Sequence, residues 1–356
     1  MRTPMRTPTI TRSPHTRGSA PRRWLRWPLF LILLGLSGCP NLDGKAADAV
    51  DGGLGVDGTS ALDAAAAGLS DAATSDVGRG LDAGVQTDAA AAGVPTTRVR
   101  IIAANLTSGK KQSWDPGHGQ RILQGLVPDI ILIQEFNLGN NSAATLAAFV
   151  QDMCGDGFSY FREANSALPN GIISRYPILA SGAWDDSLST NREFAWARID
   201  VPGPIDLWAV SVHLLTSKAT VRAKQIVELV GYIKQHVPQQ DFLIVGGDLN
   251  TTSLSEQSLQ GFDGLLDRAR VPVDQAGNGH TNSNRNKPYD RLFADFDLEP
   301  HHTAVAIGAQ AFVNGLVFDS RVYTPLINVT PAEQGDSGAE SMQHMAIVRD
   351  FAIPTP

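Results

Sequence analysis

The sequence predicts a mixed α/β domain in which two sheets pack together and helices cover their outer faces. Three observations support this fold class. Short apolar runs alternate with turn residues from about residue 98 onward. Helical periodicity occurs in only three segments between these runs. Hydrophobic residues make up 42% of the 356 residues and charged residues 18%, which suits a soluble protein with a large core.

The expected strands are short apolar runs that end at turn residues or at polar side chains. The first run, RVRIIAAN, follows Val94-Pro95, where the composition changes from small and acidic to β-branched. Runs such as IILIQ and FLIVG are apolar at consecutive positions, which is typical of strands buried on both faces. In chain order, the expected strands span residues 98–105, 130–134, 171–174, 194–201, 207–213, 242–246, 291–294 and 345–351.

The expected helices are the segments in which apolar residues recur with helical spacing. The clearest is 219–237, where Val221, Ile226, Val230 and Ile233 recur near the 3.6-residue period. Two shorter helices are expected at 117–125 and 143–153.

The first 39 residues have the pattern of a bacterial export signal. Seven arginines and no acidic residue precede an apolar run that ends at Leu36-Ser37-Gly38-Cys39. This ending resembles a lipobox, in which the cysteine is lipidated. We therefore expect residues 1–39 to be a lipoprotein signal peptide, and the protein to be exported and anchored to the membrane through Cys39, facing the periplasm or the cell surface. The alternative is a plain cleaved signal in which Cys39 is incidental.

Residues 40–97 are predicted to be a disordered linker. They are dominated by Ala, Gly and Asp, contain no aromatic residue, and carry nine acidic residues against two basic ones. We expect the linker to stay extended and residues 98–356 to form one catalytic domain. The net charge of −7 excludes the broad basic surface of a tight non-specific DNA-binding protein, so any contact with nucleic acid must be local.

Oxygen-bearing side chains stand at the ends of several apolar runs. Asn105 ends the first run, Glu135 follows IILIQ, and Asp248 and Asn250 follow FLIVG. Burying Glu135 without a partner would be costly, so we expect it to be paired or bound to a metal. Oxygen ligands suit a hard cation such as Mg²⁺ or Mn²⁺. Taken singly, a DxN sequence is more often an Asx turn, and a glutamate after a strand is usually at the surface.

Two histidines and an arginine also stand next to strands. His213 ends the run at 207–213, and His344 precedes the run at 345–351. Asp290 could orient an imidazole to make a His/Asp pair for acid or base catalysis. Arg192 could bind a phosphate oxygen. Structural histidines and a solvated arginine are the alternatives.

The series NL, IQEF, NREFAWARI, SVHL, GGDLNTT, PYDRLF and QHMAI resembles the motifs of the endonuclease/exonuclease/phosphatase superfamily, and most closely those of pancreatic-type deoxyribonuclease. The series spans nearly the whole domain, and GGDLN is its strongest member. The resemblance implies a four-layer α/β sandwich of two packed, mainly antiparallel sheets flanked by helices, with the site at one edge.

The resemblance also implies roles for single residues. Glu135 matches the metal-binding glutamate, with Asn105 supporting the metal and the phosphate. Asp248 and Asn250 match the pair that positions the attacking water.

Five further residues are carried over in the same way. His213 matches the first active-site histidine, and His344 matches the second, which Asp290 orients. Arg192 falls where nucleases place an arginine on the substrate phosphate, and Asn170 is near a position that helps the first histidine, so both are expected to contact substrate.

The final motif departs from the family pattern. Where Ser-Asp-His is usual, this chain has Met342-Gln343-His344. The Gln343 carbonyl oxygen can serve as a metal ligand but supplies no charge, so we expect weaker metal binding or an altered metal preference. Asp336 or Glu340 are the nearby candidates to compensate.

These observations predict a phosphodiester hydrolase that depends on Mg²⁺, or on Mn²⁺ or Ca²⁺, and acts as a membrane-anchored, monomeric endonuclease on DNA or RNA. A basic cluster of Lys110, Lys111, Arg285, Lys287 and Arg291 could capture the polyanion, or could be solvated surface. Two alternatives are a sphingomyelinase-like phosphodiesterase or phosphatase for lipids or small molecules, and a surface binding module with weakened catalysis.

Overall fold

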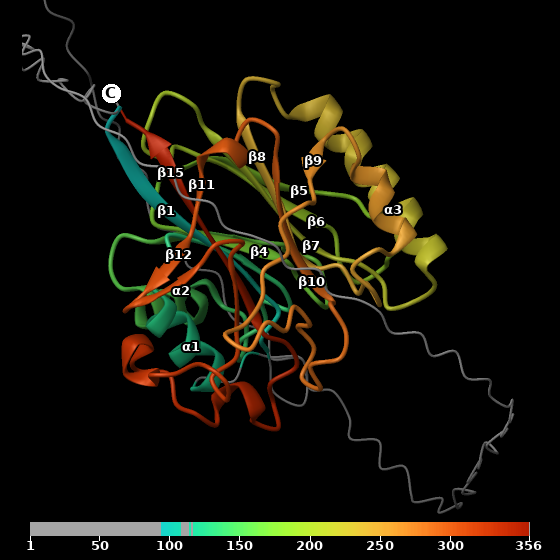
Figure 1. Cartoon of the computed structure of the whole chain (residues 1–356). Helices are drawn as coiled ribbons and strands as arrows, with labels where there is room; N and C mark the ends of the chain where they lie inside the picture. The colour runs from blue at the N-terminus through green and yellow to red at the C-terminus, as the bar shows by residue number, and fades with distance from the viewer. Residues whose placement is uncertain (1–93, 108–113, 115–116, 356) are drawn as a thin grey trace, which may run out of the picture. The chain divides into compact units, whose positions relative to one another are not determined.

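The computed structural model describes residues 94–107, 114 and 117–355 of the chain (Figure 1). The predicted signal peptide, Cys39, Lys110, Lys111 and residues 40–93 of the predicted linker lie outside the described residues. Within the described part, no helix combines the length and the hydrophobicity needed to span a membrane.

The first sheet has the strand order β11-β15-β1-β2-β4-β3, with β14 also paired to β15. Its strands are β1 (Thr96–Ala104), β2 (Ile130–Ile133), β3 (Ser159–Arg162), β4 (Gly171–Ser174), β11 (His302–Thr303), β14 (Leu316–Phe318) and β15 (Ala346–Pro354).

The second sheet has the order β5-β6-β7-β8-β10-β9. Its strands are β5 (Ile178–Trp184), β6 (Phe194–Ile199), β7 (Leu207–His213), β8 (Phe242–Asp248), β9 (Leu266–Asp267) and β10 (Asp290–Asp295). A separate hairpin joins β12 (Val305–Ile307) to β13 (Gln310–Phe312).

The three α-helices are α1 (His118–Leu126), α2 (Ala143–Cys154) and α3 (Ala219–His236). Short 3₁₀ helices occur at Gln257–Phe262, Glu299–His301, Leu326–Val329 and Asp336–Gly338.

Three apolar layers hold the structure together. One lies between the two sheets, one packs α1 and α2 on the outer face of the first sheet, and one packs α3 on the outer face of the second. Successive strand residues point to opposite faces. In β1, Ile101 therefore enters the layer between the sheets and Ile102 the layer under α1 and α2. The predicted four-layer sandwich is confirmed, and its apolar runs are the strands buried on both faces.

Each sheet contains one parallel pair of strands near its centre, and the other pairings within both sheets are antiparallel. In the first sheet β1 and β2 are parallel and are connected through α1. In the second, β7 and β8 are parallel and are connected through α3. β1 packs against β8 and β2 against β7. Asn105, just after β1, bonds to Asp248 at the end of β8, and Gln134, just after β2, bonds to Ser211 near the end of β7, so the carboxyl ends of all four strands lie at one edge of the sandwich.

Gly247, the residue before Asp248 in β8, allows the strands to approach closely at this edge. Its φ is +135°, and a Cβ atom there would lie 2.1 Å from the Val212 carbonyl oxygen of β7 and 2.6 Å from Nε2 of Gln134. An L residue rarely adopts this φ, and its Cβ atom would overlap β7 unless that strand moved.

We expect Gly247→Ala to lower the free energy of unfolding by about 3 kcal/mol or more, because it adds an overlap to an unfavourable φ. Urea denaturation would measure the change. Gly264→Ala is the matched control, since φ is +75° but a Cβ atom would meet nothing within 4 Å; it should cost about 1 kcal/mol. Equal losses in the two variants would contradict the role given to close packing.

Candidate active site

An open pocket of about 400 Å³ lies where the four strands end. Its walls contain seven of the residues predicted from the sequence, together with Leu168, Thr216, Thr252 and Tyr289. The seven are Glu135, Arg192, His213, Asp248, Asn250, Gln343 and His344. Of the other predicted residues, Asn105 and Asp290 are buried and contact residues of the pocket wall directly.

Asp248, the last residue of β8, connects the two sheets. Its Oδ2 accepts a hydrogen bond from Asn105 Nδ2 at 2.9 Å and lies 3.2 Å from Nε2 of His213. Its Oδ1 accepts the backbone N–H of Asn250 at 2.9 Å. The parallel register pairs His213 with Asp248, which explains why these two side chains meet. The carboxylate is thus held in one orientation at the base of the pocket.

His344 and Asp290 form the predicted His/Asp pair. His344 Nδ1 lies 3.0 Å from Oδ1 and 2.8 Å from Oδ2 of Asp290, and 3.8 Å from Oδ2 of Asp248. With Nδ1 bonded to Asp290, Nε2 is the nitrogen that remains for a ligand. Burial opposes the imidazolium, but the Asp290 and Asp248 carboxylates outweigh it and raise the pKa of His344 to about 9.

His213 has the opposite character. Burial lowers the pKa of His213 to about 3, although Asp248 favours its charged form. At neutral pH His213 is therefore neutral while His344 carries a proton. Different surroundings give the two histidines different protonation states, as is common where an active site needs both an acid and an acceptor.

The donor set around Glu135 fits a divalent cation. Oε2 of Glu135 and Oδ1 of Asn105 are buried and have no hydrogen-bond partner among the described residues. Burial, and then the Asp248 carboxylate, raise the pKa of Glu135. A buried carboxylate beside another carboxylate needs a positive partner, and oxygen donors are the ligands that Mg²⁺, Mn²⁺ and Ca²⁺ prefer.

A second group of potential ligand atoms comes from Asp248, Asp290 and His344, which lie within 4.8 Å of one another. We interpret it differently, because His344 Nδ1 is at hydrogen-bond distance from both oxygens of Asp290, so two of the three ligand atoms are engaged with each other. A ring nitrogen that donates a hydrogen bond has no lone pair to offer a metal. The group is therefore better suited to moving protons.

Neither acidic residue proposed to compensate for Gln343 does so. Asp336 is buried against His118 and Arg121, and its Oδ1 lies 2.9 Å from Nδ1 of His118. Glu340 is exposed and does not line the pocket. Gln343 itself is exposed on the pocket wall, so this wall presents an amide where a carboxylate was expected.

Arg192 is the one lysine or arginine that lines the pocket among the described residues. It is largely buried, its Nε donates to Oδ1 of Asn191 at 3.1 Å, and its Nη1 has no partner within the described part of the chain. A buried guanidinium nitrogen without a protein acceptor suits a phosphate oxygen.

Asn170 is not among the residues that line the pocket, and its predicted contact with substrate stays a prediction. It is fully buried, and its Nδ2 donates to the Glu193 carbonyl oxygen at 2.6 Å. Glu163, which the sequence did not single out, accepts the Glu193 N–H at 3.2 Å. The two side chains therefore fix the backbone next to Arg192. No motif marks Glu163, because it follows β3, a strand that the sequence pattern did not reveal.

Glu163 should make stability depend on pH. It is 1% exposed, and burial raises its pKa from about 4.5 to about 7. The folded protein therefore binds this proton more tightly than the unfolded chain does, and Glu163 reduces stability progressively as the pH rises from about 4.5 to about 7. Glu163→Gln should be more stable than the wild type by about 3 kcal/mol at pH 8, with the difference vanishing near pH 4.

Chemical denaturation at several pH values would test this expectation. Glu340→Gln, which changes an exposed glutamate, should leave the pH dependence unaltered. A constant difference between Glu163→Gln and the wild type from pH 4 to pH 8 would mean that Glu163 titrates normally.

Comparisons with known proteins identify the family to which the chain belongs. Residues 112–313 match the sequence pattern of the Endonuclease/Exonuclease/phosphatase family. No curated protein matches the chain. Among solved structures, it is similar to a family protein from Bacteroides thetaiotaomicron, with 16% identity over 72% of this chain and 98% of that one, and a TM-score of 0.48.

Two other solved structures are similar at the same level. A family protein from Beutenbergia cavernae shares 17% identity over 72% of each chain, with a TM-score of 0.48. A mannosyl-6-phosphatase from Bacteroides thetaiotaomicron shares 15% identity over 70% of this chain and 98% of that one, with a TM-score of 0.45. The family pattern spans more than half of the chain, which therefore belongs to the endonuclease/exonuclease/phosphatase family of phosphoesterase hydrolases.

Proposed function

We propose that the protein hydrolyses phosphodiesters with the help of a divalent cation, Mg²⁺ in the first place and Mn²⁺ or Ca²⁺ as alternatives. One observation carries the proposal: the pocket combines the His344–Asp290 pair, the free Nη1 of Arg192 and the unpartnered oxygens of Glu135 and Asn105. A binding-only descendant would have no physical need for this set, since its buried charges cost stability.

The residues of the pocket divide the chemistry among them. Arg192 binds a non-bridging phosphate oxygen. Glu135 and Asn105 would hold the divalent cation, with Gln343 as a further oxygen donor, and the bound cation would supply Lewis-acid stabilisation of the charge that grows on the phosphoryl group.

Proton transfer falls to the other pocket residues. Asp248 is a fixed acceptor that takes a proton from the attacking water, and Asn250 keeps it oriented through its backbone N–H. His344 uses Nε2 to donate to the phosphoryl or leaving oxygen, while Asp290 holds the ring.

Nucleic acid is the substrate class that we propose first, because the motif series most resembles that of deoxyribonucleases. Two of the basic residues that were expected to capture a polyanion are engaged within the protein instead. Arg285 is paired with Asp274 and Asp319, and Arg291 is buried and donates to the Ser253 carbonyl oxygen. Among the described residues, a pocket lined by one arginine and no lysine favours the second candidate, a small or lipid phosphodiester that presents one phosphate.

The test is hydrolysis of plasmid DNA, bis-p-nitrophenyl phosphate and sphingomyelin vesicles by the purified chain, with Mg²⁺, Mn²⁺ or Ca²⁺, or with a chelator. We expect activity that the chelator abolishes. His344→Ala should lower kcat about 1000-fold, within the range for loss of a general acid or base. His236→Ala is the control, because His236 is exposed at the end of α3 and does not line the pocket.

The substrates separate the candidate functions. Nicking of plasmid DNA would support the nuclease, and hydrolysis of bis-p-nitrophenyl phosphate or sphingomyelin without nicking would support the small or lipid phosphodiesterase. A wild-type protein inactive on all three with every cation would contradict the proposal and favour the binding module. Chelator-resistant hydrolysis would contradict the metal requirement.

We also propose that Cys39 anchors the protein to a bacterial membrane after the signal peptide is removed. The support is the Leu36-Ser37-Gly38-Cys39 sequence after the arginine-rich start and the apolar run. In a bacterial host, the wild-type protein should partition into the detergent phase of a Triton X-114 extract, and Cys39→Ser should move it to the aqueous phase. Detergent-phase recovery of Cys39→Ser would exclude lipidation at this residue.

A further inference from the structure

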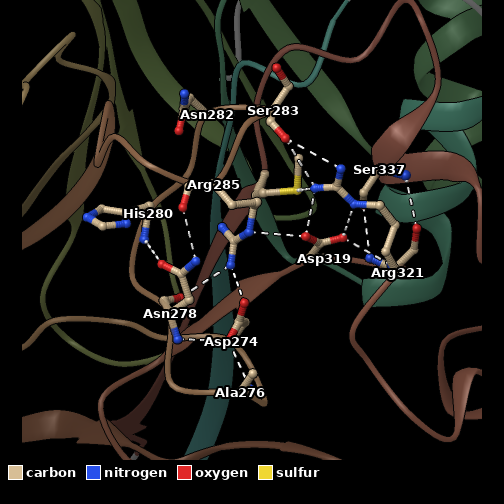
Figure 2. Close-up of polar contacts among 12 residues, drawn as sticks. Asp274, Ala276, Asn278, His280, Asn282, Ser283, Arg285, Asp319, Arg321 and Ser337 are labelled. Carbon is tan, nitrogen blue, oxygen red and sulfur yellow. Dashed lines mark hydrogen bonds and ion pairs between the residues drawn. The ribbon is translucent and has the colours of Figure 1, made fainter.

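Arg285 is an internal cation rather than part of a basic surface. Figure 2 shows its guanidinium group between the carboxylates of Asp274 and Asp319. Its Nη2 is paired with Asp274, and its Nε lies 3.1 Å from Oδ2 of Asp319. The Arg285 side chain is 12% exposed, and both carboxylates are buried. Among the described residues, Arg285 is the cation that pairs with Asp274, whereas Asp319 pairs with both Arg285 and Arg321.

The same residue closes the loop that runs from Asp274 to Lys287. Asn278 Nδ2 donates to the Arg285 carbonyl oxygen at 3.1 Å, and Arg285 Nη2 reaches the Asn278 carbonyl oxygen at 3.3 Å. Oδ1 of Asn282 accepts the N–H groups of Asn286 and Lys287. Arg285 also has a φ of +57°, a left-handed conformation that a non-glycine residue adopts only when its surroundings hold it.

The segment Thr281–Ser283 of this loop is bonded to the backbone around His344. Asn282 and His344 form an isolated antiparallel bridge. On one side of it, the Ser283 N–H donates to the Gln343 carbonyl oxygen at 2.7 Å. On the other, the Met345 N–H donates to the Thr281 carbonyl oxygen, also at 2.7 Å. The loop therefore sets the position of the backbone that carries His344.

The loop also holds the partner of His344. The hydroxyl oxygen of Thr281 accepts the backbone N–H of Asp290 at 2.9 Å. Thr281 thus bonds both to the backbone next to His344, at Met345, and to the backbone of Asp290. Arg321 fastens the far side of the loop, because its guanidinium group pairs with Asp319 and reaches the Ser283 carbonyl oxygen at 3.4 Å (Figure 2).

We propose that Arg285 is a positioning residue for the His344–Asp290 pair: by joining Asp274 to Asp319 it holds the Thr281–Ser283 segment against both members of the pair. This inference rests on the proposed hydrolytic function. Without the guanidinium group, Asp274 loses its cationic partner, and the link between the loop and Asp319 is left to Arg321, which reaches the Ser283 carbonyl oxygen only at 3.4 Å. A displacement of about 1 Å in a catalytic group is enough to lower turnover about 100-fold.

The experiment compares Arg285→Ala with the wild-type chain on bis-p-nitrophenyl phosphate, or on whichever diester the wild type cleaves. We expect kcat to fall about 100-fold and KM to change less than about threefold, because Arg285 does not line the pocket. Millimolar guanidinium chloride, well below denaturing concentrations, should restore part of the lost kcat by occupying the space between Asp274 and Asp319.

Two variants serve as controls. Arg198→Ala removes a guanidinium group that pairs with Asp206 and with the buried Asp241. These two aspartates directly precede β7 and β8, at the opposite ends of the strands from the pocket. It should leave kcat unchanged and gain nothing from guanidinium. His344→Ala should lose activity without rescue, because guanidinium cannot replace an imidazole.

If Arg285→Ala does not fold, Arg285→Lys provides the same test, since an ammonium group cannot bridge both carboxylates as a guanidinium fork does. It should lose at least about tenfold in kcat. A folded Arg285 variant with wild-type kcat, or an Arg285→Ala variant whose loss guanidinium does not reduce at all, would overturn the positioning role. A wild-type chain without activity would instead contradict the proposed function, so the two failures can be told apart.

Discussion

The site depends on one geometric constraint, the meeting of two parallel strand pairs at the same edge of the sandwich. β1 and β2 bring Asn105 and Glu135 to this edge, and β7 and β8 bring His213 and Asp248. Parallel strands are suited to this task because their carboxyl ends lie together, and each pair here is connected through a helix that covers the outer face. The remaining pair comes from two antiparallel strands: β10 begins at Asp290, and His344 lies just before β15 begins at Ala346.

Burial gives these side chains their chemical character. In water, His213 and His344 would titrate alike, yet here Asp290 and Asp248 keep one charged and desolvation keeps the other neutral. The same low exposure leaves oxygens of Glu135 and Asn105 without protein partners in the described structure. Such groups reduce stability unless a ligand satisfies them, so the pocket is organised for a cation and a phosphate rather than for its own stability.

The sequence pattern predicted secondary structure best for strands that are buried at every position. The strands at 171–174 and 207–213 were predicted with their observed bounds, and the helices to within a residue or two. β5 was missed because this edge strand, Ile178–Trp184, is half exposed and rich in small residues, so it shows no apolar pattern. The contacts of Asn170, Asp336 and Arg285 could not be predicted, because their partners lie 11 to 218 positions away. One sequence reveals strand ends but not the ion pairs that distant segments form.

The most direct test of the account is a crystal structure of the chain grown with Mn²⁺ and phosphate, in which anomalous scattering locates the cation. The account predicts the ion within coordination distance of Oε2 of Glu135 and Oδ1 of Asn105, with phosphate on Arg192 and the His344–Asp290 pair intact. An ion bound between Asp248, Asp290 and His344 instead, or an ordered phosphate pocket that takes up no cation, would contradict it.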